Sequence, residues 1–340
     1  MLIVGLTGNY GMGKSAVLSM FRELGAFTVD ADKIVRGLLR ENKVISEIKS
    51  LFGSSVFDET GRLDKEKVAE KIFKNKLLRL KLEDVIHPRV FKKISELSEK
   101  AKNKNKVFIV EAPLIFERKY EDRFEWIITV FSDEKTAIKR LAMHGITSDV
   151  AGQRLRCQLS IIEKIKKADY SIDNSRTPDK TKKQVQAVYK ELLKETKAKK
   201  LILEGKVDKA AKILEKPFSI EGKVIKGAGR GEKILHTPTA NISFKGYCPK
   251  EGVYAVKVSV AKGKGPRVNG VANIGKNPTF GASELSFEVH ILNFTENLLG
   301  KTLKVFFLKR IRDEKKFSSA KALEMQIKKD IKKAKEILSK

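Results

Sequence analysis

The chain has 340 residues, of which 71 are Lys or Arg and 42 are Asp or Glu, so its formal net charge is +29. This length exceeds what one ordinary hydrophobic core accommodates and predicts two domains. An apolar content of 41% with 18 phenylalanines is enough for packed cores and argues against wholesale disorder. No run of about 18 apolar residues occurs, which argues against a membrane span. The opening MLIVGLTGNYGMGKS is short and lacks a basic leader, and it predicts a strand rather than a signal peptide.

The basic charge is shared by both halves of the chain, because residues 201–340 hold 29 Lys or Arg and 14 Asp or Glu. It fits nucleic-acid binding or the attraction of anionic small substrates such as nucleotides, but solvated lysines on helix faces explain it equally well. Only two cysteines occur, Cys157 and Cys248, which favours free thiols in a reducing compartment. A soluble, cytoplasmic protein of two domains is therefore the first expectation.

The first half alternates short apolar runs with helical patterns. Buried strands are predicted at 2–6, 26–30, 107–112 and 126–131. Val17, Leu18, Phe21 and Leu24 form an apolar stripe that predicts a helix ending at Gly25, and further helical patterns lie at about 33–50, 64–101 and 133–144. Alternation of this kind predicts an α/β fold with a doubly wound parallel sheet.

The second half is punctuated by glycine and proline between short strand patterns. Strands are predicted at 218–226, 253–260, 287–294 and 303–309, which indicates an antiparallel sheet or a small β-barrel. One or two linking helices are predicted at 197–218, and apolar residues at helical spacing predict a C-terminal helix from about Ser319.

A glycine-rich loop follows the first predicted strand. The segment GNYGMGKS (8–15) fits the phosphate-loop pattern GxxxxGK[ST] and lies between a strand and a helix, as that pattern requires; an accidental glycine turn is the alternative. Glycines let backbone N–H groups face phosphate oxygens, and the helix N-terminus adds a favourable dipole. Lys14 is expected to contact the β- and γ-phosphates, and Ser15 to bind Mg²⁺. The expected ATP contacts are Gly8, Gly11, Met12, Gly13, Lys14, Ser15 and Ala16.

Two aspartates, Asp30 and Asp32, follow the second predicted strand at the edge where open parallel sheets bind ligands. A carboxylate there can accept the proton of an attacking hydroxyl, whereas one of the two can equally well cap the helix that follows. Further along, basic residues cluster in a segment that could close over ATP and exclude water. They are Arg140, Arg154, Arg156, Lys164, Lys166 and Lys167.

Six segments of this half occur in a fixed order and spacing: GLTGNYGMGKS (5–15), VDADKIVR (29–36), LEDVIHPRV (82–90), EAPLIFE (111–117), RLRCQ (154–158) and KADYSIDNS (167–175). In this order and spacing they resemble the dephospho-CoA kinases. The resemblance covers about residues 1–195 and implies a P-loop kinase fold with helical substrate and lid regions. It implies transfer of the γ-phosphate of ATP to the ribose 3′-hydroxyl of dephospho-CoA, with Asp32 as the general base and Arg140 and Arg154 as lid arginines. It also places Asp30, His87 and Arg89 at the substrate, although His87 alone is typical of a structural histidine.

The phosphate loop departs from the usual GGIGSGKST of that family. Ala16 lacks a hydroxyl expected near the nucleotide, and His144 stands where a lid arginine is common. Backbone contacts to phosphate survive such side-chain changes. The other departures in the loop are Asn9, Tyr10 and Met12.

In the second half, Thr239 and Asn241 lie two residues apart on an extended segment, so both side chains face one side and offer oxygen ligands to a hard cation. Glu288 interrupts an apolar strand and is either a paired surface group or a catalytic base. The nearby glycines Gly227, Gly229 and Gly231 are weak evidence of a phosphate site by themselves.

Six further segments stand in the second half: FSIEGKVIKGAGRG (218–231), HTPTANI (236–242), PKEGVYAV (249–256), NGVANIGKNPTFG (269–281), SFEVHILNF (286–294) and KRIRDEKKFSSAKALEMQIKKD (309–330). Through them residues 218–340 resemble bacterial riboflavin kinase domains, and 201–218 resembles the connector of bifunctional FAD synthetases. The resemblance implies FMN formation, with Mg²⁺–ATP at Thr239 and Asn241, phosphates at the glycine loop 227–231, and Glu288 as the base for the riboflavin 5′-hydroxyl. Leu299 and His236-Thr237 depart from the usual residues.

The sequence thus predicts a P-loop dephospho-CoA kinase-like domain (1–197), a helical linker (198–217) and a riboflavin kinase-like β-barrel with a C-terminal helix (218–340). A bifunctional kinase that uses ATP, Mg²⁺, dephospho-CoA and riboflavin is expected, with no membrane partner. One alternative is that only one domain is catalytic. Another is a basic RNA-binding protein, against which stands the lack of an aromatic pair in a recognisable RNA-reading strand.

Overall fold

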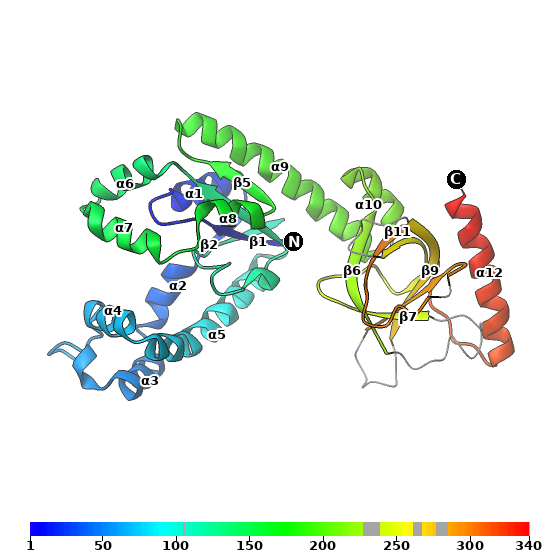
Figure 1. The fold of residues 1–340 in the computed structure, drawn as a ribbon, viewed down its shortest axis with the longest axis horizontal. Helices are drawn as coiled ribbons and strands as arrows, with labels where there is room; N and C mark the ends of the chain where they lie inside the picture. Colours follow the sequence, from blue (N-terminus) through cyan, green and yellow to red (C-terminus); the bar gives the residue numbers. More distant parts are fainter. Residues whose placement is uncertain (105, 227–238, 261–266, 277–284, 295, 340) are drawn as a thin grey trace. The chain divides into compact units, whose positions relative to one another are not determined.

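The computed structural model describes residues 1–104, 106–226, 239–260, 267–276, 285–294 and 296–339. Contacts divide the chain into two compact units, Met1–Leu193 and Lys194–Lys340. Figure 1 shows the course of the chain through both units. Among the described residues no helix combines the length and the apolar character needed to cross a bilayer.

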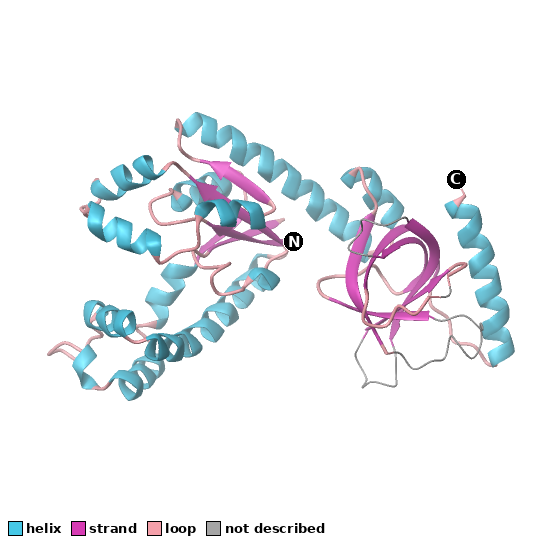
Figure 2. Cartoon of the chain, viewed as in Figure 1, coloured by secondary structure: helices cyan, strands magenta, loops and turns pink. Residues whose placement is uncertain are grey.

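An open parallel sheet forms the centre of the first unit (Figure 2). Its strand order is β2-β3-β1-β4-β5, and every neighbouring pair is parallel. This confirms the predicted α/β fold; strand β5 was not among the predicted strands. The strands are β1 (Leu2–Thr7), β2 (Phe27–Asp30), β3 (Val107–Glu111), β4 (Trp126–Phe131) and β5 (Tyr170–Asp173).

Helices cover both faces of this sheet, because alternate residues of its buried strands pack in opposite directions. Val107 and Ile109 pack with α1 (Lys14–Glu23) and α9 (Pro178–Leu203). Phe108 and Val110 pack on the other face, against four helices that form the predicted substrate region. Those four are α2 (Ala31–Leu38), α3 (Asn42–Phe52), α4 (Lys65–Lys74) and α5 (Lys76–Ala101); the remaining helices are α6 (Glu134–Ala142), α7 (Ser148–Arg156) and α8 (Ile161–Lys167).

Two long helical patterns are each divided in the structure. The pattern at 33–50 is interrupted between Leu38 and Asn42, and the pattern at 64–101 is interrupted at Asn75. The Asn75 side chain accepts hydrogen bonds from the N–H groups of Leu77 and Leu78 at 3.0 and 3.1 Å, so it begins a new helix with its own N-terminal cap. Apolar periodicity continues across such a break and does not reveal it.

The second unit is a closed antiparallel barrel with the strand order β10-β7-β6-β11-β8-β9, in agreement with the prediction of a small barrel. The helix α10 (Val207–Leu214) precedes it and α12 (Ala320–Leu338) follows it. The strands are β6 (Phe218–Ile225), β7 (Thr239–Phe244), β8 (Gly252–Val260), β9 (Arg267–Lys276), β10 (Leu285–Ile291) and β11 (Thr302–Arg312).

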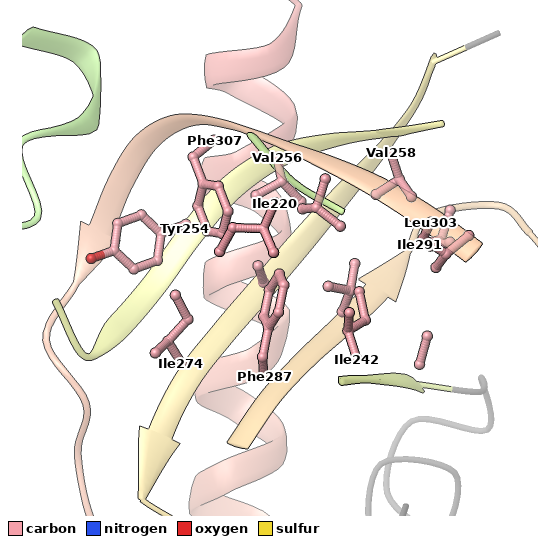
Figure 3. Packing of buried hydrophobic residues seen from close by; sticks show 14 of the residues in the cluster. Ile220, Ile242, Tyr254, Val256, Val258, Ile274, Phe287, Ile291, Leu303 and Phe307 are labelled. Atoms are coloured by element: carbon pink, nitrogen blue, oxygen red, sulfur yellow. The ribbon is translucent and has the colours of Figure 1, made fainter. Parts of the chain in front are cut away.

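Three aromatic rings fill the middle of the barrel (Figure 3). Tyr254 meets Phe307 edge-on with ring centroids 5.4 Å apart, and Phe287 stacks on Phe307 at 5.7 Å. On the outside, α12 is fixed to strand β11 by a buried ion pair in which Arg312 contacts Asp330 at 2.7 Å. The barrel therefore has a complete core of its own.

We expect Phe307→Ala to destabilise the barrel by roughly 3–5 kcal/mol, because it removes the ring that the other two contact. The only tryptophan, Trp126, lies in the first unit, so its fluorescence reports the unfolding of that unit. Calorimetry of Phe307→Ala should show an unfolding transition at a lowered temperature, whereas the transition seen by tryptophan fluorescence should keep its temperature. Phe21→Ala, in the core of the first unit, is the control and should move the fluorescence transition. Equal movement of both signals in Phe307→Ala would contradict separate unfolding.

Candidate active sites

The predicted phosphate loop joins β1 to α1 and is held tightly against β4. Gly8 has φ 146°, and a Cβ atom at that position would lie 2.2 Å from the Val130 carbonyl oxygen. Gly13 has φ 80° and precedes the first turn of α1. Both positions require glycine, since a side chain would clash at the first and strain the backbone at the second. Gly11 likewise has a positive φ of 78°.

The ammonium group of Lys14 lies among carboxylates. Its Nζ donates a hydrogen bond to the backbone oxygen of Asn9 at 3.1 Å. Burial lowers the pKa of Lys14, and the negative charges of Glu111, Asp32 and Asp30 act against that shift. Lys14 is therefore partly desolvated at the start of α1. A phosphate bound there would be stabilised both by the positive charge of the lysine and by the helix dipole.

The two aspartates after β2 have different surroundings. Asp30 caps α2: its side chain accepts a hydrogen bond from the Lys33 N–H at 3.0 Å and lies 3.9 Å from Arg36. Asp32 is in the first turn of α2 and makes no such bond within the described part of the chain. Burial raises the pKa of Asp32, and the nearby charge of Asp30 raises it further. The capping alternative from the sequence therefore applies to Asp30, whereas Asp32 has a carboxylate with a raised pKa.

A third carboxylate, Glu111, was not singled out as a site residue from the sequence. It ends strand β3 beside β1, is 8% exposed, and accepts a hydrogen bond from Ser15 Oγ at 3.2 Å. Burial raises its pKa, while Lys14 opposes the shift. Its Oε2 is buried without a hydrogen-bond partner among the described residues. Its position in the segment EAPLIFE, at the carboxyl end of a buried strand, was the available signal.

Arg140 approaches the phosphate loop from α6. Its NH2 donates to the Asn174 carbonyl at 2.8 Å, whereas NH1 is buried without a partner in the described structure, 3.4 Å from the place of a Cβ on Gly13. The Asn174 side chain, after β5, donates to the Met12 carbonyl at 3.1 Å and accepts from Thr181 Oγ at 3.0 Å. The fold therefore places Arg140 beside the loop, and it adds Asn174 and Thr181, which the sequence had not indicated as neighbours of the loop.

The other site residues expected in this half have side chains that form no hydrogen bond or ion pair with the phosphate loop in the described structure or that lie outside it. Ala16 lies exposed on α1; Arg154 belongs to α7, and its side chain is outside the described part of the structure. In α5, the Nδ1 atom of His87 is 2.6 Å from the Tyr120 hydroxyl, and burial lowers the pKa of His87. Arg89 forms an ion pair with Glu47 at 2.6 Å. Neither contact of α5 involves the phosphate loop.

In the barrel, β7 and β10 bring the three expected residues together. Glu288 lies directly opposite Asn241, and His290 lies opposite Thr239. Their neighbours Ala240 and Val289 are buried in the barrel, so Thr239, Asn241, Glu288 and His290 share the outer face. Directly opposed side chains of antiparallel strands are about 5 Å apart at Cβ, so oxygen atoms of Asn241 and Glu288 can meet one ligand.

Two neighbours of Glu288 were not predicted. Ser286 Oγ donates a hydrogen bond to Glu288 Oε1 at 3.2 Å, and Asn273 of β9 lies opposite Glu288 on its other side. Asn273 lies on another strand, and no local pattern in the sequence reveals a cross-strand neighbour. The expected glycine contacts Gly227, Gly229 and Gly231 lie outside the described residues.

Comparisons with known proteins agree with this division. The dephospho-CoA kinase family matches residues 2–179 and the riboflavin kinase family matches residues 214–338. The chain is 37% identical to the dephospho-CoA kinase of Aquifex aeolicus over 193 residues, which is 56% of this chain and 98% of the relative. It is 37% identical to that of Fusobacterium nucleatum over 175 residues, 51% of this chain and 90% of the relative. A crystal structure of a Thermus thermophilus protein superposes with a TM-score of 0.51 and 31% identity, covering 56% of this chain and 97% of that one.

The first match spans more than half of the chain, and the relatives are covered over nearly their whole length. The second match includes the whole described barrel and all of α12. Both families are phosphotransferases that act on hydroxyl groups, which agrees with a phosphate loop in one unit and a polar strand pair in the other. The chain belongs to the dephospho-CoA kinase family through residues 2–179 and carries a riboflavin kinase domain in residues 214–338.

Proposed function

We propose that this chain is a bifunctional kinase that forms CoA from dephospho-CoA in its first unit and FMN from riboflavin in its second, with ATP as the phosphate donor of both. The observation that carries the proposal is that each unit combines a family match with its own separate set of phosphate-site and base candidates. The alternative of one inactive unit has little support, because Lys14, Asp32, Asn241 and Glu288 are all present.

In the first unit, Asp32 is the proposed general base. The ribose 3′-oxygen attacks the γ-phosphorus, the bond from that phosphorus to the β–γ bridging oxygen breaks, and the hydroxyl proton passes to the Asp32 carboxylate. Lys14 and the free NH1 of Arg140 neutralise the charge of the triphosphate.

Ser15 and Glu111 offer oxygen atoms suited to Mg²⁺, and the unpartnered Oε2 of Glu111 is consistent with such a ligand set. The ion would neutralise phosphate charge when bound. Thr239, Asn241 and Glu288 form the corresponding oxygen-rich group on the outer face of the barrel. There Glu288 is the proposed base, which accepts the proton of the riboflavin 5′-hydroxyl as its oxygen attacks the γ-phosphorus of ATP.

The proposed substrates and products also account for the basic charge. ATP, ADP, dephospho-CoA, CoA and FMN are all anionic, and a net charge of +29 increases their encounter rate at low ionic strength. Cys157 and Cys248 are both free, which supports a reducing, cytoplasmic setting.

Asp32→Asn should lower CoA formation by roughly 10²- to 10⁴-fold, because it removes the base, while FMN formation stays unchanged. Glu288→Gln should have the opposite pattern. Both products are measured by chromatography on the intact chain with Mg²⁺–ATP, with riboflavin and dephospho-CoA in separate reactions, and each variant is the folding control of the other. If either substitution silences both reactions, the two-site proposal is wrong.

The pKa of Asp32 predicts the pH dependence of CoA formation. A base acts when ionised, so activity is present above the pKa of Asp32 and is lost as the pH falls through it. Asp30→Asn retains a side chain that can cap α2 but removes a charge that raises the pKa of Asp32. In the pH profile of kcat/KM for CoA formation, we expect the acidic limb of Asp30→Asn to lie at lower pH than that of the wild-type chain. Asp64→Asn, the same change at the N-terminal cap of α4, should leave the limb in place.

Glu111→Gln tests the third carboxylate. The substitution keeps the size of the side chain and an acceptor for Ser15 but removes one negative charge beside the proposed Mg²⁺ ligands. We expect kcat for CoA formation to fall roughly 10- to 100-fold, with a higher Mg²⁺ concentration at half-maximal rate. A magnesium titration of the initial rate measures both. An unchanged magnesium requirement would exclude a role of Glu111 at the ion.

A further inference from the structure

The short segment Cys157–Ser160, between α7 and α8, is fastened to the phosphate loop. The Asn9 side chain donates through Nδ2 to the Leu159 carbonyl at 3.1 Å. The Tyr10 N–H donates to Gln158 Oε1 at 2.9 Å. Two successive residues of the loop therefore hold two successive residues of this segment, from positions about 150 residues apart in the chain.

Glu117 holds the same segment through the N–H group of Leu159, whereas Asn9 binds the carbonyl group of that residue. Its Oε1 accepts a hydrogen bond from the Leu159 N–H at 3.0 Å, so both backbone polar groups of Leu159 are bound by side chains. The same carboxylate forms a 2.8 Å ion pair with Lys164, which is fully buried and also donates to the Pro113 carbonyl at 2.9 Å. The ion pair fixes the orientation of Glu117, because its loss would leave the buried ammonium without its counter-charge.

Asn9 connects this attachment with the nucleotide site. Its side chain is only 5% exposed, and its amide orientation is fixed because the Leu159 carbonyl can accept only from the NH₂ group. Its own backbone oxygen accepts the hydrogen bond from Lys14, the lysine that faces phosphate. One residue thus contacts the phosphate-binding lysine through its backbone and the end of the α6–α7 segment through its side chain.

The segment that ends at Leu159 contains α6 and α7 and carries Arg140, the arginine next to the phosphate loop. Helices α6 and α7 leave the sheet at the end of β4 and return at Leu159. Arg140 of α6 has its NH1, which has no partner among the described residues, at the phosphate loop. The start of the segment is continuous with a buried strand. Its end is held by the hydrogen bonds from Asn9, Tyr10 and Glu117 and by the packing of the Leu159 side chain against an apolar cluster. The hydrogen bonds are the part of this attachment that fixes the backbone of Leu159.

We propose that Asn9 and Glu117 form a latch on Leu159 that holds the α6–α7 segment over the bound triphosphate, which makes both of them positioning residues for phosphoryl transfer in the first unit. The role in transfer rests on the proposed function of that unit; the latch itself does not. With the latch released, the segment closes less completely. ATP then binds more weakly, and water, in place of the acceptor hydroxyl, attacks the γ-phosphorus to give ADP and inorganic phosphate.

The variant that tests the latch is Asn9→Ala. Residue 9 has no positive φ, so alanine fits its backbone, while the Leu159 carbonyl loses its donor. The amide hydrogen of Leu159 is bonded to Glu117, which the substitution leaves intact. Faster exchange of that hydrogen, by roughly tenfold in the intact chain without nucleotide, is expected because the latch acts as a unit. Asn75→Ala, which removes an asparagine cap on α5, is the matched control and should leave this exchange unchanged.

Kinetics complete the test. In Asn9→Ala we expect the KM for ATP to rise roughly tenfold, and the ratio of ADP to CoA formed to increase, while Asn75→Ala keeps both at wild-type values. Gln158→Ala weakens the same segment through a different residue and should change exchange and kinetics in the same direction; it replaces Asn9→Ala if that variant does not fold.

Unchanged exchange at Leu159 overturns the latch, whether or not the KM changes. Faster exchange with unchanged KM and an unchanged ADP to CoA ratio overturns the positioning role. If the wild-type chain forms no CoA from dephospho-CoA, the proposed function of the first unit fails, and the exchange comparison still decides the latch.

Discussion

The close approach of the phosphate loop to strand β4 governs the layout of the first unit. Gly8 lies so near the Val130 carbonyl that a methyl group could not be inserted between them, and the loop is thereby pressed onto the end of the sheet. Everything else at the site is placed relative to that contact: Lys14 begins α1, the carboxylates of β2 and β3 lie beside the lysine, and Arg140 reaches the loop from the helix that follows β4.

The two units place a base candidate and oxygen ligands in different ways. In the first, parallel strands end at a common edge, and residues that follow neighbouring strands meet there, as Asp32 and Glu111 do. In the second, the polar residues lie within antiparallel strands, and the register places Asn241 opposite Glu288. Neighbouring parallel strands bring the residues at their carboxyl ends together, whereas paired antiparallel strands bring alternate side chains together on one face.

Local patterns in the sequence were sufficient for the fold class, the phosphate loop and the aspartate pair, because each is encoded within about a dozen neighbouring residues. Strand β9 was hidden by glycines, and its structure explains them: a Cβ on Gly270 would lie 2.9 Å from the His290 carbonyl oxygen. Asn174 and Thr181 reach the loop only through folding. Lys164, taken from its sequence as part of a basic segment over ATP, is instead fully buried with Glu117, since nothing local to Lys164 reveals a partner 47 residues earlier.

The closure of the barrel has a consequence for the architecture of the chain. An open sheet presents unpaired N–H and C=O groups on its outer strands, and these can pair with any neighbouring extended segment. In the described barrel each strand pairs with two others, so none of these strands is an outer edge strand. A module of this kind can be joined by a helix to an unrelated catalytic partner without competing for that partner's strands during synthesis, which makes it well suited to gene fusion.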